Sequence, residues 1–252
     1  MTKVIVTCNQ KGGVGKTTTA VNIAAFFSIF GKKTLLIDFD PQGNASSGVG
    51  VDVSKLDKCI YNCLIDGENI KNIIIKTRTN NLDLAPSTQR LAGADVELVN
   101  IENRENRLKE TIKGIKSSYD YIIIDSPPSL SLLTINALVA ADEVIIPVQC
   151  EYYALEGLSN LMNTLELVRL NLNTNLRVKG IVLTMFDSRT LLSKQVVDEA
   201  RDHFNEKVFE TVIPRNVRLS EAPSFGEPII YYDPTSSGAV AYESLSKELL
   251  NG

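Results

Sequence analysis

Short apolar runs recur along the chain, and longer segments in which apolar residues have helical spacing separate them. The short runs predict strands, which we place at residues 3–8, 34–37, 81–85, 121–124, 143–148, 178–184 and 207–213. The longer segments predict helices at residues 17–30, 56–64, 103–115, 130–140, 154–170, 190–204 and 236–250. Strands that alternate with helices in this way are typical of βαβ units.

The predicted strands also indicate how the sheet is covered. Residues 121–124 and 144–146 are apolar without alternation, as expected when helices pack on both faces of a parallel sheet. No linker rich in Pro, Gly or Ser divides the chain, and it has no internal repeat. We therefore predict a single α/β domain over residues 1–252, built on one doubly wound, mostly parallel sheet flanked by helices.

Composition changes this picture little. The chain of 252 residues is 44% hydrophobic and 22% charged, and it has no run of 18 apolar residues that would predict a membrane span. It enters a predicted strand directly, so we expect no export signal and a cytoplasmic protein. The net charge of -4 argues against a protein wholly devoted to nucleic acid but permits a local basic patch.

The cysteines do not predict a metal site. Cys8, Cys59, Cys63 and Cys150 form no C-x-x-C pair, and His203 is the single histidine. The usual zinc ligand sets are therefore not available. We expect four free thiols that are buried or half-buried.

The segment CNQKGGVGKTTTA, residues 8–20, carries the clearest chemistry. It lies between a predicted strand and a predicted helix, and it matches the phosphate-binding loop G-x-x-x-x-G-K-[ST] except that Gln10 replaces the first glycine. Glycines let backbone N–H groups curl round phosphates, and the following helix adds its dipole. The residues that we expect to hold the nucleotide here are Lys11, Gly12, Gly13, Val14, Gly15, Lys16, Thr17 and Thr18.

Four side chains in and near this loop have specific expected roles. Lys16 should reach the β- and γ-phosphates, and the Thr17 hydroxyl should ligate Mg²⁺, while Thr18 is placed to contact the α-phosphate. Asp125 ends the predicted strand YIIID, at the edge where ligands of a parallel sheet gather. Its carboxylate is therefore expected to hold Mg²⁺ or a metal-bound water. These features together predict a P-loop NTPase-like enzyme.

The second lysine, Lys11, carries a resemblance to a known family. KGGVGKTT resembles the deviant Walker A motif of the ParA/MinD superfamily of ATPases, and similar motifs follow along nearly the whole chain: DFDPQGNASSG, IIIDSPPSL, LTMFDSRT and IPRNVRLSEAPSFG. The sequence most resembles the chromosome-partitioning ParA, or Soj-type, ATPases. That resemblance implies Mg²⁺-dependent hydrolysis of ATP to ADP and phosphate, and the lack of an N-K-x-D tetrad agrees with adenine rather than guanine.

The resemblance also implies roles for individual residues. Lys11 would reach across a dimer interface to the phosphates of the partner subunit, as an arginine finger supplied in trans. Asp40 matches the aspartate that positions the attacking water, and Asp38 matches a supporting acid nearer the metal. Pro214 and Asn216 would contact the adenine. Met185 is expected to help them.

Members of this family form an ATP-bound sandwich dimer that coats double-stranded DNA without sequence preference, and a DNA-bound ParB partner stimulates hydrolysis. The resemblance therefore implies a homodimer, a ParB-type partner that acts through a short basic N-terminal segment, and association with the nucleoid. Arg189 and Arg218 correspond to DNA-contacting arginines of the family, and Lys194 and Arg215 could extend the basic patch.

Alternative functions remain open at this stage. A MinD-like membrane ATPase would need a basic amphipathic C-terminal helix, whereas ESLSKELLNG has one lysine against two glutamates. A nitrogenase-reductase-like protein would need cysteines at motif positions, and a plasmid-type ParA often has an extra N-terminal domain; we expect neither here. A nucleotide-gated regulator, acting for example on a replication initiator with incidental hydrolysis, is the remaining alternative.

Overall fold

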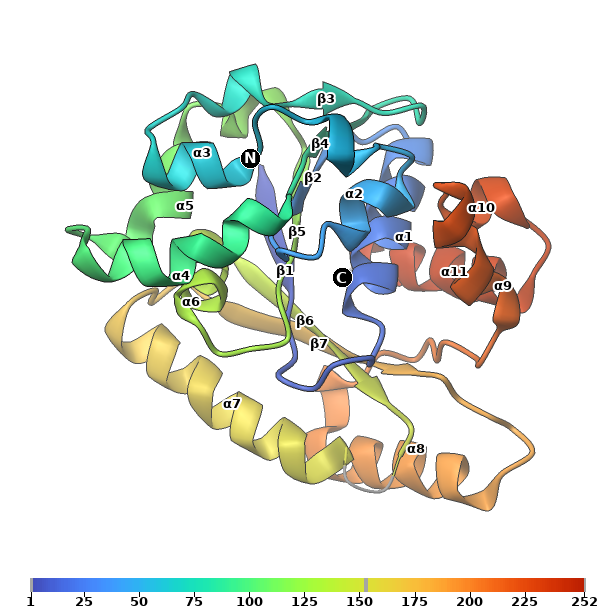
Figure 1. The fold of residues 1–252 in the computed structure, drawn as a ribbon. Coiled ribbons are helices and arrows are strands. Elements are labelled where there is room, and N and C mark those ends of the chain that lie inside the picture. The colour runs from blue at the N-terminus through green and yellow to red at the C-terminus, as the bar shows by residue number, and fades with distance from the viewer. Residues whose placement is uncertain (1, 152–153, 252) are drawn as a thin grey trace.

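A seven-stranded sheet runs through the middle of the molecule (Figure 1). The computed structural model describes residues 2–151 and 154–251. The strands follow the order β3-β4-β2-β5-β1-β6-β7, and all neighbours are parallel except the antiparallel pair β3 and β4. The strands are β1 (Lys3–Thr7), β2 (Thr34–Asp38), β3 (Ile75–Lys76), β4 (Leu82–Ala85), β5 (Tyr121–Asp125), β6 (Glu143–Gln149) and β7 (Arg177–Thr184). The predicted mostly parallel sheet is confirmed.

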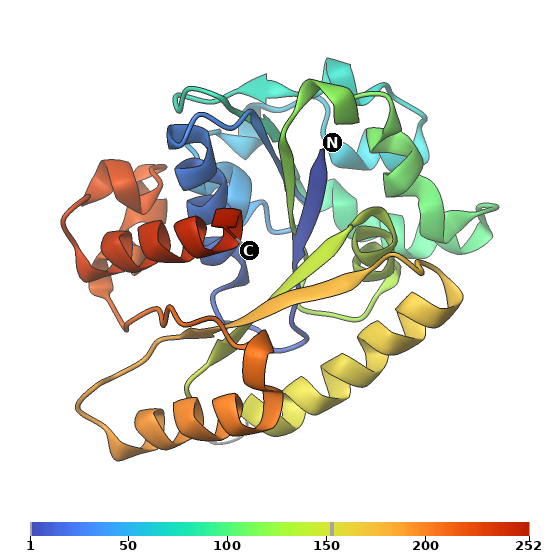
Figure 2. The same ribbon diagram turned by 180° about the vertical axis from the view of Figure 1, so that it is seen from behind.

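Helices cover both faces of this sheet (Figures 1 and 2). Those that the structure describes are α1 (Lys16–Ile29), α2 (Asn44–Gly48), α3 (Ile60–Ile65), α4 (Ala94–Glu97), α5 (Arg107–Lys113), α6 (Leu132–Ala140), α7 (Ala154–Asn171), α8 (Leu191–Phe204), α9 (Val217–Glu221), α10 (Ile229–Tyr232) and α11 (Ser237–Asn251). A 3-10 turn, Ala222–Phe225, continues α9. Because each face has its own helices, the sheet separates two hydrophobic cores.

Successive residues of the central strands point into these two different cores. On β5, Ile122 and Ile124 join the core beneath α5, α6 and α7, whereas Ile123 joins the core beneath α1 and α11. All three side chains are fully buried. Because both faces are covered, these strands have no polar face and read as continuous apolar runs.

The predicted strand at residues 207–213 is wrong. The segment is extended beside β7, and Phe209 N–H donates to the Ile181 carbonyl at 3.0 Å, but it forms only isolated bridges in the described part of the chain. The N–H groups of Glu210 and Thr211 donate instead to the carboxylate of Glu248 on α11, at 2.8 and 3.1 Å. A side chain of α11 therefore takes the donors that a strand would need.

Other differences concern element ends. The predicted helix at 56–64 begins at Ile60, and the one at 103–115 is the shorter α5, preceded by a 3-10 turn from Arg104 to Asn106. The four cysteines are free and buried, as expected. Over residues 2–151 and 154–251, no helix combines the length and the apolar character that crossing a bilayer requires.

Candidate active site

Three polar residues meet at the carboxyl ends of the central strands. Asp125 at the end of β5 is the register partner of both Thr7 on β1 and Asp38 on β2. All three are fully buried. The order of the strands thus places side chains from three separate segments at the edge where a parallel sheet binds its ligands.

The loop after β1 presents backbone N–H groups and open space. Gly15 is the N-cap of α1, with φ of 89°, and α1 has neither a side-chain cap nor an acidic residue in its first turn. A side-chain β-carbon at Gly12 or Gly13 would meet no atom within 4 Å. A 14-residue helix with an uncapped N-terminus and a clear cradle in front of it suits a phosphate chain.

Residues outside the motif brace this loop. Thr184 Oγ1, at the end of β7, donates to the Val14 carbonyl at 2.9 Å. Asn9 Nδ2 donates to the Pro147 carbonyl at 2.7 Å, and Asn9 Oδ1 accepts from the Lys11 N–H at 3.0 Å. Neither bracing residue was identified from the sequence. The position of Thr184 at the end of a predicted strand was the available signal.

Lys16 lies inside the loop rather than in solvent. Its side chain is buried, and its Nζ donates to the Lys11 carbonyl at 3.0 Å. Burial lowers the pKa of Lys16, and the negative charge of Asp125 acts in the opposite direction. The ammonium group therefore has one neutral acceptor and a nearby carboxylate, and it is available to phosphate oxygens in the cradle.

Asp125 has a buried oxygen without a partner. Its Oδ1 accepts from Thr7 Oγ1 at 3.4 Å, while Oδ2 has no hydrogen-bond partner among the described residues. Burial and the nearby charge of Asp38 raise the pKa of Asp125 well above its usual value, and the neighbouring Thr17 side chain opposes that rise. An unsatisfied buried carboxylate oxygen beside a threonine hydroxyl fits the oxygen ligands that Mg²⁺ prefers.

Asp38 holds the loop that carries Asp40. Its Oδ2 accepts from both the N–H and the Oγ of Ser46 at 2.7 Å, and its Oδ1 accepts from the Asp40 N–H at 3.2 Å. Burial raises the pKa of Asp38 to about 6, against these hydrogen bonds. Both oxygens thus have partners within the loop, so a direct metal contact by Asp38 stays a prediction. Ser46 was not singled out from the sequence, although it lies within the DFDPQGNASSG segment.

Asp40 lies beside these groups, and Lys11 lies at the rim. Asp40 is 8% exposed, and its Oδ1 accepts from the Gln42 N–H at 2.9 Å, which leaves its other carboxylate oxygen available. Lys11 Nζ forms an ion pair with Glu151 Oε2 of its own chain at 2.9 Å. No sequence motif indicated Glu151, because it lies 140 residues after Lys11 in the chain.

Met185, Pro214 and Asn216 line one cavity of about 350 Å³ together with Gly15 and Thr18. Met185 has a φ of 54°, a conformation that bulky residues adopt rarely and that clusters at ligand sites. Thus the predicted base-contacting residues lie together beside the phosphate loop, although most of the chain separates them from it in sequence. Their contact with adenine stays a prediction.

Arg189 and Arg215, two of the residues predicted to contact DNA, lie on neighbouring segments. The Phe186 N–H donates to the Ile213 carbonyl, and the Arg215 N–H donates to the Phe186 carbonyl, so the segments that carry Arg189 and Arg215 run side by side. Arg189 is exposed and forms a two-pronged ion pair with Asp187, at 2.9 and 2.7 Å. Lys194, in the first turn of α8, is also exposed.

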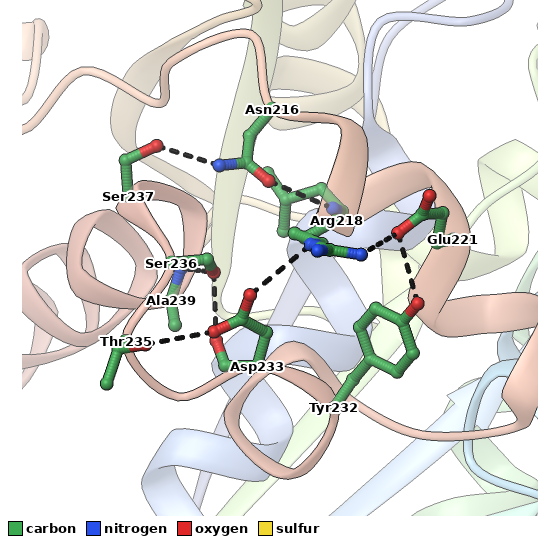
Figure 3. Close-up of polar contacts among 10 residues, drawn as sticks. Asn216, Arg218, Glu221, Tyr232, Asp233, Thr235, Ser236, Ser237 and Ala239 are labelled. Atoms are coloured by element: carbon green, nitrogen blue, oxygen red, sulfur yellow. Dashed lines mark hydrogen bonds and ion pairs between the residues drawn. The ribbon is translucent and has the colours of Figure 1, made fainter.

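Arg218 is held on the surface by two carboxylates (Figure 3). Its guanidinium lies 2.9 Å from Glu221 Oε2 and 3.4 Å from Asp233 Oδ2. Tyr232 also donates to Glu221, at 3.0 Å. Both predicted DNA arginines are thus already paired with acids of their own chain, which no sequence pattern indicated.

Comparisons with known proteins agree with this geometry. A family model described as an AAA domain matches residues 2–178. The chain is 57% identical over 249 residues to the sporulation initiation inhibitor protein Soj of Bacillus subtilis, covering 99% of this chain and 98% of that protein. The chain belongs to the Soj and ParA family of chromosome-partitioning ATPases. It is also 50% identical over 250 residues to the chromosome-partitioning ATPase Soj of Treponema pallidum, covering 99% and 98%.

A solved structure supports the ligands of this partitioning ATPase. Cobyrinic acid a,c-diamide synthase from Mycobacterium smegmatis, solved with bound ADP and magnesium, has a TM-score of 0.88 and 34% identity, covering 100% of this chain and 95% of that one. The name of that protein describes a different activity, and its identity is far below that of the Soj relatives. The cradle, the buried Lys16 and the unpaired Asp125 oxygen fit ATP and Mg²⁺ in the ATPase described here.

Proposed function

We propose that this partitioning ATPase works as an ATP-dependent homodimer that binds double-stranded DNA without sequence preference. A ParB-type partner stimulates its hydrolysis, and the cycle separates copies of a chromosome or a plasmid on the nucleoid. Control of replication initiation is a further outcome of the same cycle. The whole chain, residues 1–252, acts as one ATPase domain.

The observation that carries the proposal is the convergence at the carboxyl edge of the sheet. Lys16, which is buried inside the loop, neutralises the β- and γ-phosphates in this proposal. Asp125, through its unpaired Oδ2, and the Thr17 hydroxyl would hold Mg²⁺. Mg²⁺, when bound, supplies charge neutralisation at the reacting phosphate.

Two further residues complete the hydrolytic step in this proposal. Asp40 orients the attacking water with the carboxylate oxygen that Gln42 does not use, while Asp38 holds its loop in place. Lys11 leaves Glu151 and reaches the nucleotide of the partner subunit, where charge develops that one subunit does not neutralise. Two chains are then needed for one complete site.

The basic residues that we predict to contact DNA support nucleotide-dependent DNA binding. Dimerisation would align Arg189, Arg215 and Arg218 of both subunits, with Lys194, into one track along the DNA phosphates. The overall charge of -4 is compatible with such a track, because binding depends on where the charges lie.

One experimental design separates this function from its alternatives. Gel filtration and co-sedimentation with DNA are carried out with ATP, with ADP and without nucleotide, and with anionic lipid vesicles in place of DNA. We expect an ATP-dependent dimer that sediments with DNA and not with vesicles. Vesicle binding would indicate a MinD-like ATPase. An ATP-dependent dimer that binds neither DNA nor vesicles would indicate a nucleotide-gated regulator.

A variant of the phosphate loop tests the nucleotide site itself. Lys16→Ala should abolish ATP binding, and tight binding by that variant would contradict the loop assignment.

A further inference from the structure

A short segment separates the base cavity from a second cavity beside the Asp40 loop. Leu219 and Pro223 line both the base cavity and a space of about 390 Å³ between α1, α2 and α10. The second cavity is also lined by Thr17 of the phosphate loop and by Asn44 and Ser47 of α2. The segment 216–226, which consists of α9 and the following 3-10 turn with their flanking residues, therefore lies between the base cavity and residues 40–50, which include α2 and which we call the Asp40 loop.

This segment meets the end of the Asp40 loop backbone to backbone. A β-carbon on Gly226 would lie 2.8 Å from the Gly50 Cα and 3.3 Å from the Ser47 carbonyl oxygen, and one on Gly50 would lie 3.0 Å from the Gly226 carbonyl oxygen. Both glycines have positive φ, 84° at Gly50 and 67° at Gly226. No side chain at this contact can rotate aside, so a shift of one turn toward the other displaces it.

The other end of the segment is fixed by polar contacts (Figure 3). Asn216 caps α9 by accepting from the Leu219 N–H at 3.4 Å, and its Nδ2 donates to Ser237 Oγ at 2.7 Å. Arg218 joins α9 to the turn before α11 through Asp233. These contacts tie Asn216, which we predict to contact the base, and Arg218, which we predict to contact DNA, into one segment.

We propose that Gly50 and Gly226 are positioning residues that couple the Asp40 loop to the segment 216–226. When the loop orders on the γ-phosphate, the glycine contact moves α9, so that Asn216 and Arg218 take their positions for the base and for DNA. This inference rests on the proposed function, because it assigns the route by which ATP changes DNA affinity.

The test replaces one glycine and keeps a matched control. Gly226→Ala adds a methyl group at the contact, whereas Gly67→Ala adds one at a similar φ of 71° where no atom lies within 4 Å. For Gly226→Ala we expect ADP affinity close to the wild type, but the ratio of DNA affinities with ATP and with ADP should fall at least about 5-fold, and kcat should fall more than KM changes. Gly67→Ala should retain the ratio. A folded Gly226→Ala protein with the wild-type ratio overturns the inference.

Two further measurements decide the matter where Gly226→Ala does not fold. Gly50→Ala introduces a less severe contact and should show the same loss of the ratio. In the wild type, hydrogen exchange should show that amides of residues 43–50 and 217–226 gain protection together when a non-hydrolysable ATP analogue replaces ADP. Protection confined to 43–50 contradicts the coupling. If the wild type neither hydrolyses ATP nor binds DNA, the proposed function itself fails. The wild-type measurements therefore test the proposed function, and the glycine variants test the coupling.

Discussion

Lys11 Nζ lies 2.9 Å from Glu151 Oε2, and the two side chains are each about half exposed, at 48% and 46%. An exposed ion pair of this kind contributes about 0.2–1 kcal/mol. The lysine that the proposed mechanism places in the neighbouring site is therefore held in its own subunit by a weak contact, which the phosphates of a partner's nucleotide can displace at little cost.

Removing that contact should favour the dimer slightly. Glu151→Gln releases Lys11 in both subunits, so the dissociation constant of the ATP-bound dimer should fall by up to about 30-fold, the factor that corresponds to two pairs of about 1 kcal/mol each. Analytical ultracentrifugation with a non-hydrolysable ATP analogue measures it. Glu166→Gln is the matched control, since Glu166 pairs with Arg169 on the exposed side of α7. A weaker dimer with Glu151→Gln would show that the pair has a different role.

Mixing two inactive variants tests whether Lys11 works in trans. Lys11→Ala and Asp40→Ala should each lower turnover by at least about 100-fold, because each removes a group that acts in the transition state. A heterodimer of the two has one site with an intact Asp40 and the partner's intact Lys11. Each heterodimer should therefore regain half of the wild-type turnover, and an equal mixture that pairs at random should regain about a quarter per dimer. No recovery, with heterodimers demonstrated by native mass spectrometry, would place Lys11 in its own subunit's site.

The buried Asp38 predicts a pH dependence of stability in the nucleotide-free protein. Its pKa is about 6 in the folded protein against an ordinary value of 3.8, so the stability that its protonated form provides is complete below about pH 4 and is lost as the pH rises through 6. The loss is about 3 kcal/mol for a shift of this size. The wild-type free energy of unfolding, relative to that of Asp38→Asn, should fall by this amount between pH 4 and pH 7 in urea titrations.

Asp52 provides a control with the opposite sign. Hydrogen bonds from Ser54 and Lys55 lower the pKa of this exposed carboxyl to about 2, so its contribution is present above about pH 4 and is lost only as the pH falls toward 2. The difference between wild type and Asp52→Asn should therefore stay constant between pH 4 and pH 7. Parallel wild-type and Asp38→Asn curves over that range would contradict the burial argument.

The contribution of Arg189 to DNA binding should be distinguishable from that of other exposed arginines. Arg189→Ala should weaken DNA binding by the ATP-bound dimer about 10-fold and reduce the slope of log affinity against log salt by about 1 for each DNA phosphate that the variant leaves unneutralised. Arg169→Ala removes an arginine paired in the same two-pronged way with Glu166, on a different helix, and should leave both quantities unchanged. Equal losses of affinity in the two variants would indicate a general charge effect.

Asp187 competes with DNA phosphates for Arg189 in this interpretation. Asp187→Asn removes the carboxylate that holds both prongs of the guanidinium. DNA affinity of the ATP-bound dimer should then rise a few-fold, most clearly at low salt. Fluorescence anisotropy with a labelled duplex measures the change. A fall in affinity would mean that Asp187 orients Arg189 for DNA instead.

Much of the fold and of the phosphate site could be predicted because the signals are local. Val4 and Val6 lie directly before the glycine loop, and Asp125 directly follows its apolar strand. The position at which a strand ends determines where the polar residue at that end lies. The meeting of Lys16 with Asp125 also requires that β5 pairs with β1, which only the structure shows.

The alternating fold, the phosphate loop and the acids at the strand ends are all readable in the chain itself, since backbone periodicity and glycine conformations are properties of neighbouring residues. Only the tertiary structure decided three contacts: Glu248 accepts from the N–H groups of residues 210 and 211, Glu151 pairs with Lys11, and Gly226 contacts Gly50. Each of these contacts joins residues that are far apart along the chain. Whether they meet depends on how helices pack on the sheet, which no local pattern records.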